Sequence, residues 1–166
     1  MDFKNQQERI SEAVNRNQMF NTKVIPIVFH IIHDGHPIGE DENVSVAQIE
    51  NAVSILNEDY NTLNPDLENV VSEFQNLIGD ANIEFRLAKL DPNGNCTNGI
   101  NRILSNMTNQ ANDCIKELIA WDDSKYVNIW VVEDIDNSIG AAAYTYLPGS
   151  LWDDEAEGII INHEYL

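Results

Sequence analysis

The chain has 166 residues, of which 43% are hydrophobic, and this is the size and composition of one ordinary folded domain. Its 28 acidic side chains against 9 basic ones give a formal net charge of -19, which repels nucleic-acid phosphates and anionic membrane surfaces. These features argue against a disordered chain and against nucleic acid or a membrane as partner, and no apolar run reaches the roughly 20 residues that cross a bilayer.

The chain begins with a polar segment, residues 1–22, whose composition differs from that of residues 23–166. It is rich in Asn, Gln and Glu, and its only helical stripe is the weak one formed by Ile10, Ala13 and Val14. It lacks the basic and apolar regions of a secretory signal, so the protein is either cytoplasmic or has lost its leader. We expect residues 1–22 to form a leading helix or arm, which could be the end of a propeptide, and residues 23–166 to form one domain.

The first part of this domain shows a strand, a helix and a second strand. Residues 24–32 are apolar on both faces, which is typical of a central strand, and Pro26 stands near its start, where a missing N–H is tolerable. Ser45 and Gln48 match a capping box, and they precede a one-sided apolar stripe of Ile49, Ala52, Val53, Leu56 and Tyr60. Residues 83–87 alternate in polarity and predict a half-buried strand. This order predicts a right-handed parallel crossover.

The second part predicts one more helix and three more strands. Residues 70–78 could add a short helical turn before it. The helix is expected around residues 113–121, with an apolar face of Cys114, Ile115, Leu118 and Ile119. The strands are expected at residues 126–132, 140–149 and 158–163, the middle one closing in a Pro148-Gly149 turn. Five strands, two helices and no internal repeat predict a single α/β domain with a mostly parallel sheet.

The histidines give no metal site by spacing alone. His30, His33 and His36 recur every three residues, but strand alternation sends His30 and His33 to opposite faces, so we interpret them as structural. His163-Glu164 resembles the start of H-E-x-x-H, yet it follows a β-type Ile run and has no second histidine four residues on. No metal ligand and no catalytic residue is therefore assigned.

The cysteines and loop carboxylates leave alternatives open. Cys96 and Cys114 could form one disulfide in an oxidising compartment, or they could be two buried free thiols. Carboxylates in loops could hold Ca²⁺ through their oxygens, although no D-x-D-x-D-G loop is present. Most of the acidic residues are expected to be solvated loop charges.

Several segments in order resemble the pappalysin (cytophagalysin-like) family of metzincin zinc metalloendopeptidases. They span most of residues 23–166, and each is a weak signal alone. They are residues 25–33 (IPIVFHIIH), 45–61 (beginning SVAQI and ending LNEDYN), 82–88 (NIEFRLA), 91–100 (DPNGNCTNGI), 125–132 (KYVNIWVV) and 144–149 (YTYLPG). The resemblance implies the N-terminal part of a catalytic domain, the upper subdomain, with a twisted five-stranded, mostly parallel sheet, one antiparallel edge strand and backing helices.

The resemblance also implies a site. The edge strand would form the upper rim of a substrate cleft, where unpaired backbone groups hold an extended peptide or protein substrate. Its candidate substrate-binding residues are Ala141, Ala142, Ala143, Tyr144, Thr145 and Tyr146. The alternative for the same residues is a short covered edge strand whose small side chains serve packing. By the resemblance the full-length parent would bind Zn²⁺ and be secreted.

The sequence departs from the family at the catalytic motif. The H-E-x-x-H-x-x-G-x-x-H helix and the methionine turn do not occur in the 166 residues, so no zinc ligand or catalytic glutamate is carried over. We therefore expect a truncated catalytic domain without its active-site helix, which hydrolyses nothing by itself. The alternative is a non-catalytic metzincin-like binding module that presents its acidic surface or exposed edge to a partner.

Overall fold

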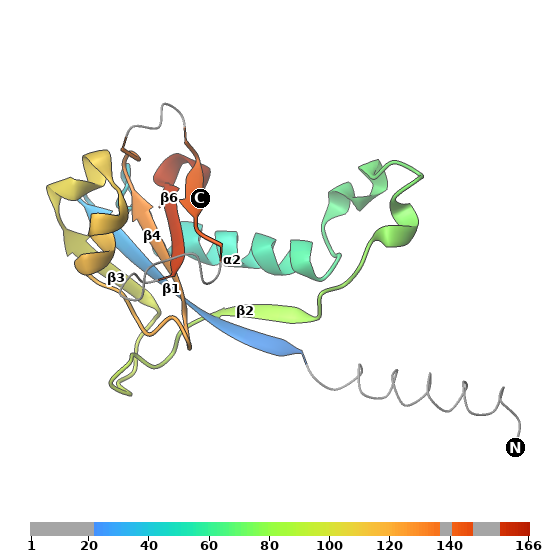
Figure 1. Ribbon diagram of the computed structural model, residues 1–166, viewed down its shortest axis with the longest axis horizontal. Helices are drawn as coiled ribbons and strands as arrows, with labels where there is room; N and C mark the ends of the chain where they lie inside the picture. Colours follow the sequence, from blue (N-terminus) through green and yellow to red (C-terminus); the bar gives the residue numbers. More distant parts are fainter. Residues whose placement is uncertain (1–21, 137–140, 148–156) are drawn as a thin grey trace, which may run out of the picture.

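The computed structural model describes residues 22–136, 141–147 and 157–166, and its centre is a six-stranded sheet (Figure 1). The strand order is β2-β1-β4-β6-β5, and β3 is a further neighbour of β1. All pairs are parallel except β5 with β6, so the predicted mostly parallel sheet with one antiparallel edge strand is confirmed. The strands are β1 (Lys23–His33), β2 (Ile83–Leu87), β3 (Ile100–Leu104), β4 (Val127–Val132), β5 (Ala143–Thr145) and β6 (Gly158–Asn162).

Strand β1 organises the sheet because it pairs along both of its edges. One edge pairs with β4, and the other pairs first with β2 and then with β3. Both faces of β1 are also covered, because its side chains belong to separate core clusters on the two sides of the sheet, and this explains its unbroken apolar sequence. Ile27, Phe29 and Ile31 face the core on the side of helix α2 (Val46–Tyr60), and Ile32 faces the opposite core together with Trp130.

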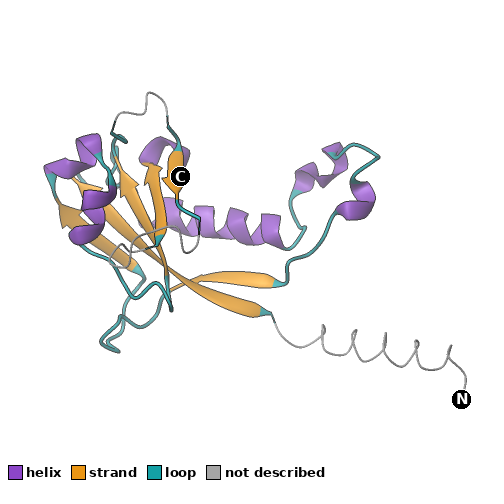
Figure 2. Cartoon of the chain, in the orientation of Figure 1, coloured by secondary structure: helices purple, strands orange, loops and turns teal. Residues whose placement is uncertain are grey.

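Helix α2 covers one face of the sheet, as Figure 2 shows, and it begins where the sequence predicts. The Ser45 side chain accepts a hydrogen bond from the backbone N–H of Gln48 at 3.1 Å, which supplies the predicted N-cap. Ile49 is the only fully buried residue of the helix. Asn57 bonds both the N–H and the C=O of Phe85, at 2.7 and 2.9 Å, so the helix also holds the outer strand β2 in place.

Three elements differ from the prediction. Strand β3 was not predicted, since its sequence INRIL does not alternate in polarity, and it brings the strand number to six. The helix expected at residues 113–121 is only the 3-10 turn η4 (Asp113–Glu117), and α2 is the single α-helix among the described residues. After η4 the chain is bound to β4, because the Asn128 side chain bonds both the N–H and the C=O of Trp121, at 2.8 and 2.9 Å.

The remaining helical segments are short 3-10 turns. They are η1 (Pro65–Asn69), η2 (Gln75–Leu77), η3 (Asn106–Gln110) and η5 (His163–Tyr165). The first two, η1 and η2, follow α2, and Figure 1 shows this green segment extending away from the sheet. No helix in the described ranges is long and apolar enough to cross a membrane. Residues 1–21 of the predicted N-terminal arm (residues 1–22) and the predicted Pro148-Gly149 turn lie outside the described residues.

Candidate substrate-binding edge strand

The candidate substrate-binding residues lie together at one end of the sheet. Ala143, Tyr144 and Thr145 form β5, which pairs with β6 and has no strand on its other side in the described structure. Ala142 precedes β5 and continues the pairing, since its C=O accepts a hydrogen bond from the N–H of Asn162 at 2.9 Å. Ala141 packs against the core cluster that contains Trp130, and Tyr146 follows the strand. The structure therefore places all six residues in or next to an edge strand.

The pairing register determines which backbone groups face outward. Ala142 and Tyr144 lie at the hydrogen-bonded positions of the antiparallel ladder, because Ala142 bonds Asn162 and residues two apart share the same side. Ala143 and Thr145 occupy the alternate positions, so their N–H and C=O groups point away from β6. Both residues are exposed. This side of β5 is the edge at which another extended chain could add.

A polar cluster holds the end of β5 against turn η4. The hydroxyl of Tyr146 donates to Asp113 at 2.7 Å, and the ammonium of Lys116 lies 2.8 Å from the other oxygen of this carboxylate. Lys116 also lies 5.1 Å from the centre of the Tyr146 ring. Burial acts to raise the pKa of Asp113, but the hydrogen bonds from Lys116 and Tyr146 outweigh it and hold the pKa below its usual range. Sequence reasoning did not identify Asp113 or Lys116, because no local pattern links them to β5.

The residues that resemble a zinc motif do not form one. His163 and Glu164 lie in the three-residue turn η5, and His163 Nε2 lies 3.1 Å from a carboxylate oxygen of Glu133. The three-histidine zinc site of the family does not fit the described residues. Their one group of metal-ligand type joins Asp34 and Glu42 to a single histidine, His36.

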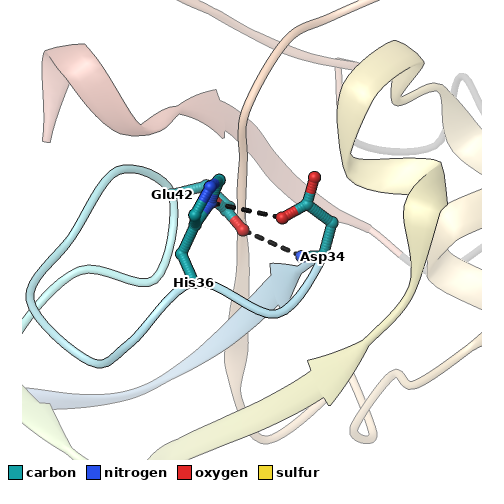
Figure 3. Close-up of side chains that lie close together, drawn as sticks. All are labelled: Asp34, His36 and Glu42. Carbon is teal, nitrogen blue, oxygen red and sulfur yellow. Dashed lines mark hydrogen bonds and ion pairs between the residues drawn. The ribbon is translucent and has the colours of Figure 1, made fainter.

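This group lies in the loop between β1 and α2, and sequence reasoning missed it. His36 was interpreted together with His30 and His33, but only His36 lies between two carboxylates, as Figure 3 shows. Its nearest partner, Glu42, is six residues away and is brought back by the loop. The two glycines on either side of His36, Gly35 and Gly39, are the sequence signal that could have indicated such a return, and both adopt positive φ angles in the structure.

The structure contains no bond between Cys96 and Cys114, and both side chains are exposed. Their exposure does not fit the alternative of two buried thiols. The disulfide between them stays a prediction.

Comparison with known proteins adds sequence evidence to the fold. No protein-family profile and no curated protein sequence matches the chain. Two solved structures of mirolysin, one in complex with a compound and one of mature mirolysin from Tannerella forsythia with a cleaved peptide, are 33% and 34% identical to it, with TM-scores of 0.73 and 0.74. Both alignments cover 86% of this chain and 53% of the mirolysin chain. A promirolysin mutant from Tannerella forsythia is 31% identical with a TM-score of 0.72, over 96% of this chain and 54% of that one.

The chain therefore spans about half the length of the structures that it matches. The matched part contains the parallel strands, the antiparallel β5–β6 pair and the single α-helix. The resemblance expected from the sequence is confirmed. By fold and by sequence, this chain is a relative of mirolysin, a pappalysin-family metzincin metallopeptidase, and it corresponds to the N-terminal part of the mirolysin catalytic domain.

Proposed function

We propose that the chain is the N-terminal part of a zinc-dependent metalloendopeptidase and that β5 aligns the peptide substrate. The observation that carries this proposal is the antiparallel strand at the end of a sheet that matches mirolysin at about one residue in three. The cleaved peptide bound to mature mirolysin supports a peptide or protein substrate for the parent of this chain.

The edge strand has the geometry that strand addition requires. The outward backbone groups of Ala143 and Thr145 are two residues apart, which is the repeat at which a second extended chain offers its own N–H and C=O groups. The small side chain of Ala143 lets such a chain approach closely. The contacts of Tyr146 with Asp113 and Lys116 anchor the end of the strand before substrate arrives, which lowers the entropy lost on binding.

The zinc chemistry belongs to the parent protein. In such a peptidase Zn²⁺ polarises the scissile carbonyl and activates the attacking water. The residues of this chain supply the sheet and the aligning edge, so we expect the purified 166-residue chain to hydrolyse no peptide bond. Secretion of the parent and a role for Ca²⁺ rest on the family alone and stay predictions.

Two substitutions at one outward position test the role of β5 in the protein extended past Leu166. Ala143→Pro removes an outward N–H and leaves the ladder to β6 intact, because proline is tolerated on an edge. Its matched control, Ala143→Ser, keeps the N–H.

One lost hydrogen bond should lower kcat/KM by about two- to tenfold, mainly through KM, in the proline variant alone. Equal kinetics in the two variants would contradict the aligning role. An extended protein that binds peptides without cleaving them would support the binding module instead.

A further inference from the structure

The loop between β1 and α2 brings metal-ligating side chains together near the carboxyl end of β1. It starts at Asp34, directly after the strand, and returns to the start of α2 through Glu42 and Asn43. The Asn43 side chain donates to the backbone C=O of His36 at 2.6 Å, and the N–H of Gly39 donates to the C=O of Asn43 at 2.7 Å. Backbone and side-chain hydrogen bonds therefore fix the loop before any ligand binds.

Three side chains of this loop point toward one another (Figure 3). Asp34, His36 and Glu42 each offer one ligand atom, and the three atoms lie within 4.8 Å of one another. The Nδ1 atom of His36 lies 2.7 Å from Glu42 Oε2 and 3.2 Å from Asp34 Oδ1. Two ligands at about 2.1 Å from one ion are separated by roughly 3 Å, so these distances suit a shared cation.

The buried Glu42 carboxylate is an independent sign that a cation belongs here. Its side chain is 0% exposed, and one oxygen accepts the backbone N–H of Asp34 at 2.8 Å, which leaves the other directed at His36. Burying a carboxylate is costly unless a positive charge compensates it. Within the described ranges no lysine or arginine forms an ion pair with Asp34, Asp41 or Glu42.

The surroundings add further negative charge. Asp41 Oδ2 lies 3.7 Å from the Nε2 atom of His36. The carboxylates of Asp34, Asp41 and Glu42 therefore all lie within 4 Å of the His36 ring, which is more negative charge than one imidazolium can balance.

We propose that Asp34, His36 and Glu42 bind one divalent transition-metal ion of the Zn²⁺ type. One imidazole nitrogen and two carboxylate oxygens suit Zn²⁺, Co²⁺ or Mn²⁺, whereas Ca²⁺ prefers an all-oxygen shell. Asp34 and His36 are partly exposed, so water completes the coordination. The ion replaces the hydrogen bond between His36 and Glu42 and fastens the end of β1 to the start of α2. The proposal is independent of the peptidase function, and either can fail without the other.

Calorimetric titration of the 166-residue chain with Zn²⁺ after removal of metals tests the proposal. Both cysteines are first replaced by serine, because the exposed thiols of Cys96 and Cys114 would also bind Zn²⁺. We expect one ion per chain, a higher Tm with Zn²⁺, and no displacement by a hundredfold excess of Ca²⁺.

Variants of the same protein locate the ion. His36→Gln and Asp34→Asn change partly exposed side chains and should each weaken Zn²⁺ binding at least tenfold. Two control variants should bind Zn²⁺ like the parent. Glu40→Gln changes an exposed carboxylate of the same loop, and His163→Gln removes a histidine outside the loop, the one that pairs with Glu133. Absence of Zn²⁺ binding, unchanged binding in His36→Gln, or ready displacement by Ca²⁺ would overturn the proposal.

Discussion

His30 and Asn128 form a hydrogen bond between neighbouring strands inside the sheet, with 2.9 Å between His30 Nε2 and Asn128 Oδ1. Both side chains are fully buried. The same Asn128 oxygen accepts the backbone N–H of Trp121, so it is the acceptor and His30 Nε2 carries the proton. His30 Nδ1 then accepts a hydrogen bond from Asn101 at 3.2 Å. The network therefore fixes a neutral histidine in one tautomer.

We expect this histidine to make the fold sensitive to acid. Burial lowers the pKa of His30 from 6.5 to about 4, against the smaller effect of the Asn128 hydrogen bond. Between these values the unfolded chain takes up a proton that the folded chain does not, so the free energy of unfolding falls as the pH is lowered from 6.5 to 4. The loss attributable to His30 should be about 3 kcal/mol and should level off below pH 4.

Denaturant unfolding from pH 7.5 to pH 4 measures this loss in the parent and in His30→Gln. The variant is less stable throughout, but it lacks the titrating ring, so its stability should fall less steeply over the same interval. Parallel curves for the two proteins would show that His30 is not the acid-sensitive group.

Gly158 allows β6 to lie close to β4. A side-chain carbon at this position would meet the backbone oxygen of Asn128, and it would lie 2.6 Å from the ring of Trp130. We expect Gly158→Ala to lower the free energy of unfolding by about 1–3 kcal/mol more than Gly94→Ala does. Gly94 is the matched control, because it also has a positive φ but has no atom within 4 Å of the added carbon. Equal thermal stability of the two variants would contradict this packing.

The N-cap of α2 gives a third prediction. Ser45→Ala removes the acceptor for the N–H of Gln48 and should cost about 1 kcal/mol in chemical denaturation. Ser54→Ala is the control within the helix, since this hydroxyl bonds only the exposed Glu58 side chain at 3.3 Å, and its effect should stay within about 0.5 kcal/mol. A larger loss in Ser54→Ala than in Ser45→Ala would contradict the assigned cap.

The fold was predictable where local patterns decide it. The capping serine and one-sided apolar stripe predicted α2, and the apolar residues of β1 predicted a central strand. Strand β3 was not predicted, because the charged residue Arg102 at its centre interrupts the apolar pattern. Its guanidinium donates to the C=O of Val44 at 2.8 Å and to the side chain of Asn43, which holds the loop before α2. Such a role depends on segments far apart in the chain.

The candidate sites also differ in how far the sequence predicts them. The edge strand around Ala143 followed from a family resemblance spread over many segments, and the structure places it at the end of the sheet. The group of Asp34, His36 and Glu42 could not be predicted by spacing, because only the folded loop turns the Glu42 carboxylate back toward the ring. The contact of Tyr146 with Asp113 likewise joins residues that are 33 positions apart.

The most direct test of the central claim is the zinc content and peptidase activity of the protein translated from the gene past Leu166. The extended protein is tested with His36→Gln, so that the loop of Asp34, His36 and Glu42 does not bind a second ion. We then expect one tightly bound zinc ion per chain, and cleavage of peptides that stops when a chelator removes this ion. A reading frame that ends at Leu166, or an extended protein that neither holds zinc nor cleaves peptides, would contradict it.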